Sequence, residues 1–77
     1  MYYDLWDMRS RNQLETFETE QEALAAVRAY LAADLRYADS LSLGYEDEQG
    51  GEGIIAEGPA LALRARAAAR ETKAAAP

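Results

Sequence analysis

The sequence predicts a small α+β domain in the order ββαββα, with a four-stranded antiparallel sheet and two helices on one face. Two observations lead to this prediction. An extended hairpin pattern followed by a helical pattern occurs twice, in residues 1–36 and again in residues 40–73. The chain has 77 residues, the length of one domain. Residues 1–73 are therefore expected to form a single unit, and residues 74–77 a disordered tail.

The first half begins with a predicted hairpin. Residues 2–8 are rich in aromatic side chains, which favour a strand, and the polar residues 9–12 are typical of a turn. Residues 13–18 alternate between polar and apolar side chains like a returning strand. Leu14 and Phe17 are three positions apart, so regular alternation predicts that they lie on opposite faces of the sheet.

A helix is predicted to follow, from Glu20 to about Asp34. The Thr19 hydroxyl can accept a hydrogen bond from the Glu22 amide while the Glu22 carboxylate reaches back, an arrangement known as a capping box. The early acidic residues also suit the positive end of the helix dipole. Apolar side chains then recur at spacings of three and four, which predicts one buried stripe made of Leu24, Val27, Leu31 and Leu35.

The second half repeats the order. Residues 41–45 alternate like a half-buried strand, residues 46–53 form an acidic and glycine-rich turn, and residues 54–56 form a short strand. Gly58 and Pro59 suit the start of a second helix, which is expected to run to about residue 73. The predicted core takes apolar residues from both halves: Tyr3, Leu5, Leu14, Leu24, Val27, Leu31, Leu41, Leu43, Ile54 and Leu61.

The composition limits the possible functions. The chain contains no cysteine and no histidine, so it has no disulfides, no thiolate or imidazole nucleophile or base, and no thiolate metal ligand. We therefore expect a protein that is not an enzyme and has no cofactor. A domain this short buries only about 60% of its unfolded surface, which makes self-association an attractive source of stability and predicts a homodimer. No signal peptide or membrane span is visible, so a cytoplasmic location is expected.

Two segments resemble ligand-binding motifs but do not meet the requirements of those motifs. The segment 46–52 carries four acidic residues, but Gly51 falls where an EF-hand loop needs an oxygen ligand. Residues 51–56 match the spacing G-x-G-x-x-A, which binds a pyrophosphate only between a strand and the start of a helix. Here the motif leads into a predicted strand and is surrounded by acidic residues. An acidic turn is the preferred interpretation of both matches.

The net charge of −6 is unevenly distributed. Residues 1–57 carry four arginines and thirteen acidic residues, whereas residues 58–77 carry four cations and one acid. An acidic body argues against binding along a nucleic-acid backbone, so nucleic acid is an unlikely partner. The basic last helix nevertheless offers possible anion contacts, which make an antitoxin-like or nucleic-acid-associated regulator the alternative function: Arg64, Arg66, Arg70 and Lys73.

The aromatic side of the first hairpin is the strongest indication of function. Alternation places Tyr3 and Leu5 on one face and leaves other large side chains on the opposite face. If the helices cover the first face, the second is exposed, and exposed aromatic and methionine side chains are typical of interfaces. The sequence therefore predicts a non-catalytic interaction module that forms a homodimer, or binds a protein partner, through Tyr2, Trp6, Met8 and Phe17.

Residues 19–28 resemble the capped helix that follows the sheet in HicB-type antitoxins. The resemblance implies a sheet packed on such a helix and a role in neutralising a small RNA-cleaving toxin. It covers one helix of one half, and the opening here is a hairpin rather than the three strands of that family. No functional residue is carried over. The whole chain also looks like short bacterial proteins, which implies nothing about mechanism.

Overall fold

The computed structural model describes residues 1–75, together with the side chains of residues 1–70. Its element order confirms the predicted α+β fold, with four strands in one antiparallel sheet and two α-helices. A short 3₁₀ helix, η1, lies between α1 and β3 where only a connector was expected. The elements are β1 (Tyr2–Asp7), β2 (Asn12–Phe17), α1 (Glu20–Ala33), η1 (Leu35–Asp39), β3 (Leu41–Glu46), β4 (Glu52–Glu57) and α2 (Gly58–Ala75).

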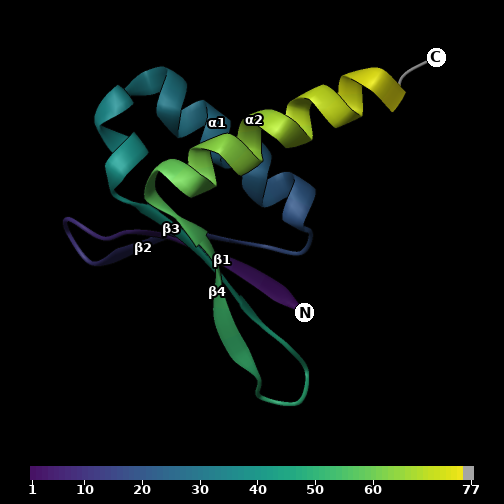
Figure 1. The fold of residues 1–77 in the computed structure, drawn as a ribbon. Helices are drawn as coiled ribbons and strands as arrows, with labels where there is room; N and C mark the ends of the chain where they lie inside the picture. Colours follow the sequence, from purple (N-terminus) through teal and green to yellow (C-terminus); the bar gives the residue numbers. More distant parts are fainter. Residues whose placement is uncertain (76–77) are drawn as a thin grey trace.

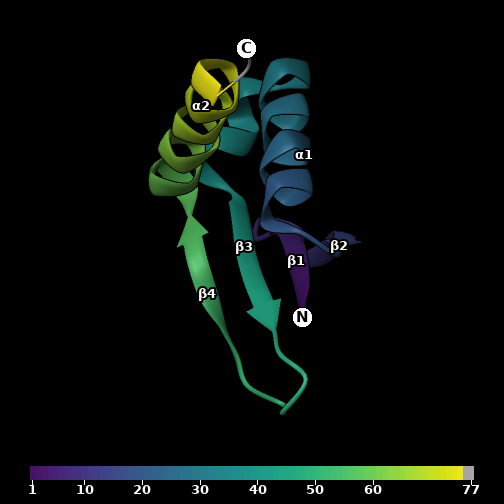
Figure 2. The same cartoon turned by 90° about the vertical axis from the view of Figure 1, so that its right-hand side faces the viewer.

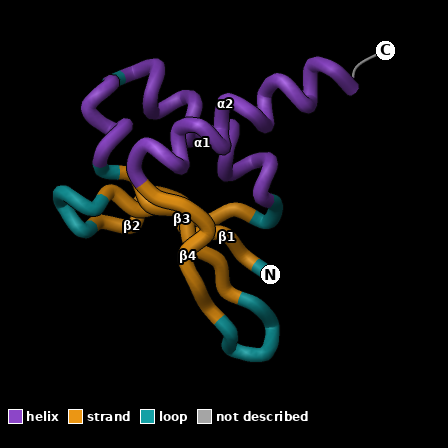
Figure 3. The backbone as a smooth tube through the Cα atoms, viewed as in Figure 1, coloured by secondary structure: helices purple, strands orange, loops and turns teal. Residues whose placement is uncertain are grey.

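The sheet has the strand order β2-β1-β3-β4, so the two hairpins are joined through an antiparallel pairing of β1 with β3. Leu5 and Leu43 are direct partners in that central pairing. Both helices lie on the same side of the sheet, as Figures 1 and 3 show. Figure 2 shows that the turn end of the β3–β4 hairpin extends beyond the helices. One face of the sheet is therefore covered by helices, and the other is not.

The core lies between the helices and the covered face of the sheet. Thr19 caps α1 as predicted, because its Oγ1 accepts a hydrogen bond of 3.1 Å from the Glu22 amide. The Arg28 Nη1 donates to the carbonyl oxygen of Ala65 at 2.7 Å and so links the two helices. The buried apolar side chains are Leu5, Ala23, Leu24, Val27, Leu31, Leu41, Leu43, Leu61, Ala62 and Ala65.

A β-bulge in β2 overturns the predicted faces of the first hairpin. Leu5 pairs with Glu15 and Trp6 pairs with Gln13, so Leu14 is an extra residue without a direct partner. An extra residue shifts the alternation by one position. Leu14 and Phe17 therefore both pack against the core, whereas regular alternation had predicted opposite faces.

A second bulge, in β4, overturns one predicted core residue. Leu43 pairs with Ala56 and Gly44 pairs with Ile54, which leaves Ile55 as the extra residue. Ile55 packs against the core, while Ile54 faces away from the helices and is 63% exposed. The prediction that Ile54 is a core residue is wrong. Two isoleucines stand next to each other, so the apolar pattern does not show which of them faces the core when a bulge shifts the alternation.

The ends of the helices also differ from the predictions. α1 ends at Ala33, and Asp34 caps η1 through a hydrogen bond from the Arg36 amide to its carboxylate. Leu35 therefore leaves the apolar stripe of α1 and is 74% exposed. α2 continues to Ala75, so the first two residues of the expected tail 74–77 are helical. The other two, 76–77, lie outside the described residues.

Candidate functional site

The face of the sheet opposite the helices is the candidate site, and we call it the open face. Strand alternation and the two bulges determine its members. Trp6 lies near its middle, in the row that joins it to Gln13 on one side and Ser42 on the other. The exposed apolar side chains on this face are Tyr2, at 53%, and Ile54, at 63%. Its residues are Tyr2, Asp4, Trp6, Gln13, Thr16, Ser42, Gly44, Glu46, Glu52, Ile54 and Glu57.

Asp4 is held in place by side chains of β2. Its Oδ1 accepts hydrogen bonds from Thr16 Oγ1 at 3.0 Å and from Gln13 Nε2 at 3.2 Å. The same Gln13 Nε2 lies 2.6 Å from Thr16 Oγ1, which closes a triangle of polar groups. These contacts fix the orientation of the Asp4 carboxylate. Asp4 belongs to β1, the strand that pairs with β3.

Glu46 lies beside Asp4, whose negative charge repels the Glu46 carboxylate. The charge of Asp4 raises the pKa of the Glu46 carboxyl, and a hydrogen bond that protonated Glu46 makes to Asp4 raises it further. Burial and the charge of Glu52 add to the increase in this pKa. Glu46 and Glu52 are also direct cross-strand partners, an arrangement that destabilises a sheet when both side chains carry the same charge. Three carboxylates are therefore crowded on one part of the open face.

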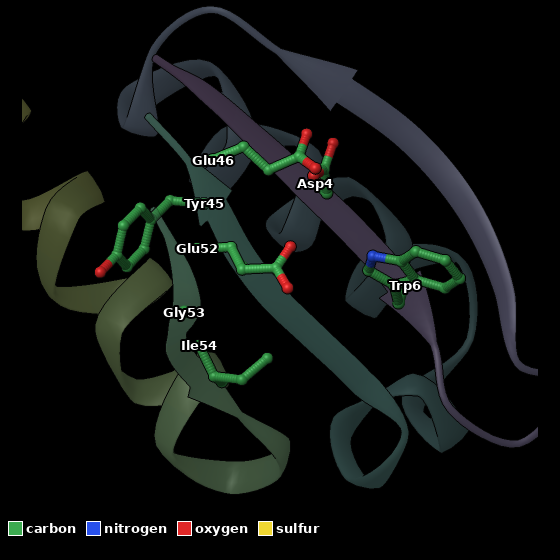
Figure 4. A pocket seen from close by; sticks show the side chains of 8 residues that line it. Asp4, Trp6, Tyr45, Glu46, Glu52, Gly53 and Ile54 are labelled. Carbon is green, nitrogen blue, oxygen red and sulfur yellow. The ribbon is translucent and has the colours of Figure 1, made fainter. Parts of the chain in front are cut away.

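These groups surround a shallow hollow with a volume of about 400 Å³. Figure 4 shows the carboxylates of Asp4 and Glu46 next to each other, with Glu52 facing the same space. The nitrogen-bearing edge of the Trp6 indole faces the side on which these carboxylates lie. Tyr45 also lines the hollow, but its ring points away from the carboxylates in Figure 4. The hollow thus combines an aromatic ring, an exposed aliphatic side chain and three acidic groups.

Of the four predicted interface residues, the structure places two on the open face. Tyr2 and Trp6 both project from β1 on this side. Met8 lies beyond the end of β1, where its amide donates a hydrogen bond of 2.7 Å to the carbonyl of Ser40, and it is 50% exposed. Phe17 was predicted near Trp6, and this position is wrong. Phe17 pairs with Tyr3 and packs against the core, on the helix side.

The four predicted anion contacts are also divided. Arg64 binds Glu20 at the start of α1, with its Nε at 2.7 Å and its Nη2 at 2.6 Å from Oε1. It therefore joins the two helices. Arg66 and Arg70 are exposed on α2. The side chain of Lys73 lies outside the described residues.

Asp7 is a further acidic residue, on the helix side at the end of β1, and is only 8% exposed. Burial raises the pKa of its carboxyl, but hydrogen bonds from the Arg9 amide and the Ser10 hydroxyl and the charge of Arg9 leave the pKa below its ordinary value. The Ser40 hydroxyl also lowers this pKa, although it makes no hydrogen bond of good geometry. Asp7 thus stabilises the β1–β2 turn rather than forming part of the open face.

Among the described residues, no group of three or more acidic side chains is arranged to hold a metal ion. No helix there has both the length and the apolar character needed to span a membrane.

The sequence analysis missed the acidic part of the site. Asp4 alternates with Tyr2 and Trp6, so its place on the open face was readable from the first strand alone. The proximity of Asp4, Glu46 and Glu52 depends on the pairing of β1, β3 and β4, which no local pattern determines. In comparisons with known proteins, no family model, no curated protein and no solved structure matches this chain.

Proposed function

We propose that the protein is a non-catalytic interaction module that binds a basic, partly apolar segment of a protein partner through the open face. One observation carries the proposal. Trp6 and Ile54 lie on a sheet face without helices, next to a hollow crowded by three carboxylates. Apolar contact would hold such a segment at the centre, and its lysine or arginine side chains would meet the carboxylates.

Electrostatic conflict supports this choice of partner. The negative charge of Asp4, and to a smaller extent that of Glu52, acts on Glu46 and raises the pKa of its carboxyl. A local arrangement that opposes folding is a common property of functional sites, because selection for binding maintains it. A cation placed in the hollow would remove the repulsion and would gain from all three charges.

The same charges oppose a symmetric dimer through this face. Two copies joined by it would bring both sets of carboxylates together, and like charges facing each other are costly in an interface. The edges of the sheet are also poor docking sites, because both edge strands contain a bulge that interrupts the regular ladder. The proposal therefore retains the predicted aromatic interface but gives it a cationic partner.

The alternative function, a regulator that contacts nucleic acid through α2, has less support. Of its four cations, Arg64 is already in an ion pair with Glu20. The other cations among the described side chains of α2 are Arg66 and Arg70, on a chain of net charge −6. Strong binding to a phosphate backbone usually needs more positive charge than this.

A peptide titration tests the proposal. The probe is a synthetic helical peptide with leucines and arginines on one face, and its control carries glutamates in place of the arginines. We expect the basic peptide to change the fluorescence of Trp6 and to bind one to one, while the acidic peptide does not bind. Glu52→Gln should weaken binding about twofold to fivefold, as expected for an exposed charge.

The matched control is Glu18→Gln, which removes the same charge from the connection between β2 and α1. It should leave the affinity unchanged, which separates binding at the open face from general attraction to an acidic protein. Equal weakening by both variants, or no binding of the basic peptide, would reject the proposal.

A further inference from the structure

The outward side of α2 has an unexpected apolar and basic character. Leu63 is 62% exposed, and Arg66 and Arg70 follow it at spacings of three and four residues, so all three share one side of the helix. Leu61, Ala62 and Ala65 are buried on the inner side of the same helix. The described part of α2 therefore presents an exposed leucine and two arginines away from the core.

This side of α2 is complementary to the open face. The helix offers an apolar side chain next to two positive charges, and the open face offers Trp6 and Ile54 next to three negative charges. The two surfaces belong to opposite sides of the molecule, because α2 packs on the helix side of the sheet (Figure 1). They cannot meet within one molecule.

We infer that α2 of one copy docks on the open face of a second copy, with Leu63 against Trp6 and Ile54 and with Arg66 and Arg70 against the carboxylates. This inference rests on the proposed function and names one partner for it, a second copy of this chain. Such a contact joins two different surfaces, so each added copy leaves one open face and one α2 available for another. The predicted homodimer becomes a head-to-tail assembly.

Two variants, each damaged on one surface, provide the test. Ile54→Lys places a cation on the open face at an exposed position of an edge strand, where lysine is well tolerated. The double variant Arg66→Ala, Arg70→Ala removes the charges of α2 and leaves good helix formers in their place. Arg11→Asn, in the β1–β2 turn, removes a cation outside both surfaces and tolerates the positive φ of 60° at that position.

Sedimentation equilibrium is measured from about 10 µM to about 1 mM, the range in which a small, weak interface assembles. We expect the wild type and Arg11→Asn to form assemblies that grow with concentration. Each surface variant alone should show at least a tenfold weaker association. Their equimolar mixture should form heterodimers and stop there, because only one intact contact is possible in it.

Circular dichroism confirms that each variant is folded, and Glu52→Lys replaces Ile54→Lys if that variant is not. A wild type that stays monomeric at 1 mM, or a mixture that does not associate, would overturn the inference. A wild type that forms only a closed dimer would overturn it as well. If the basic peptide binds but copies do not associate, the proposed function stands and this inference fails.

Discussion

Replacing Ile54 and Ile55 one at a time with alanine tests the register of β4 and the apolar part of the open face. Each change removes three carbon atoms, worth about 2.4 kcal/mol if the side chain is fully buried. Ile54 is 63% exposed, so only about a third of this, about 0.9 kcal/mol, should be lost on Ile54→Ala. Ile55 packs against the core, and Ile55→Ala should lower the free energy of unfolding by about 2 kcal/mol.

Urea denaturation followed by far-ultraviolet circular dichroism measures both values, because Trp6 lies too close to the substitutions to serve as a neutral fluorescent probe. The basic peptide should also bind less tightly to Ile54→Ala than to wild type, although this variant should lose less than half the stability that Ile55→Ala loses. Equal stability losses for the two variants, or a larger loss for Ile54→Ala, would show that β4 has no bulge at this position. The open face would then lack its exposed aliphatic side chain.

Three further predictions concern charge and backbone packing. Glu46→Gln removes the repulsion from Asp4 that raises the pKa of Glu46, so it should increase the urea midpoint at pH 7 and weaken binding of the basic peptide; a lower midpoint would contradict this. The pKa of Asp34 is lowered from 3.8 to about 2, mainly by hydrogen bonds from the side chain and the amide of Arg36. Asp34→Asn should therefore lose stability that the wild type has above about pH 4 and that disappears as the pH falls through about 2; a difference between the two proteins that does not depend on pH would exclude this cause. Gly44→Ala should lower the thermal midpoint more than Gly53→Ala, because a Cβ at position 44 would lie 2.9 Å from a backbone oxygen, whereas at position 53 it meets a movable tyrosine ring; the reverse order would contradict the close strand packing.

The sequence was sufficient to predict the order of the elements. The capping box at Thr19 and Glu22 marks the start of α1, and the glycine-rich turn separates β3 from β4, both through short-range chemistry. Such local patterns predict the structure correctly here because the tertiary packing is compatible with the helix start and the turn that they favour.

The faces of the edge strands could not be predicted in the same way. A bulge adds one residue without a characteristic residue type at Leu14 or Ile55, and it reverses the side on which later residues lie. Phe17 and Ile54 were therefore assigned to the wrong faces. The apolar spacing of three between Leu14 and Phe17 was the available signal, since a bulge lets both side chains reach the core.

The acidic part of the site is a product of tertiary structure. Asp4 and Glu46 are 42 positions apart in the chain and meet only because β1 and β3 pair in one particular register. Sequence reasoning treated the acidic residues of the second hairpin as a solvated turn. The sequence alone could not show that two of them, Glu46 and Glu52, line the same hollow as Trp6.

Mapping the bound peptide by amide chemical shifts tests the open face most directly. A ¹⁵N-labelled sample of the full chain is titrated with the basic helical peptide, and the shifts are assigned along the sequence. The proposed interface predicts that the largest changes occur at Asp4, Trp6, Gly44, Glu52 and Ile54, with small changes along α1. Changes concentrated on α1 or α2, or spread evenly over the acidic residues of the chain, would contradict it.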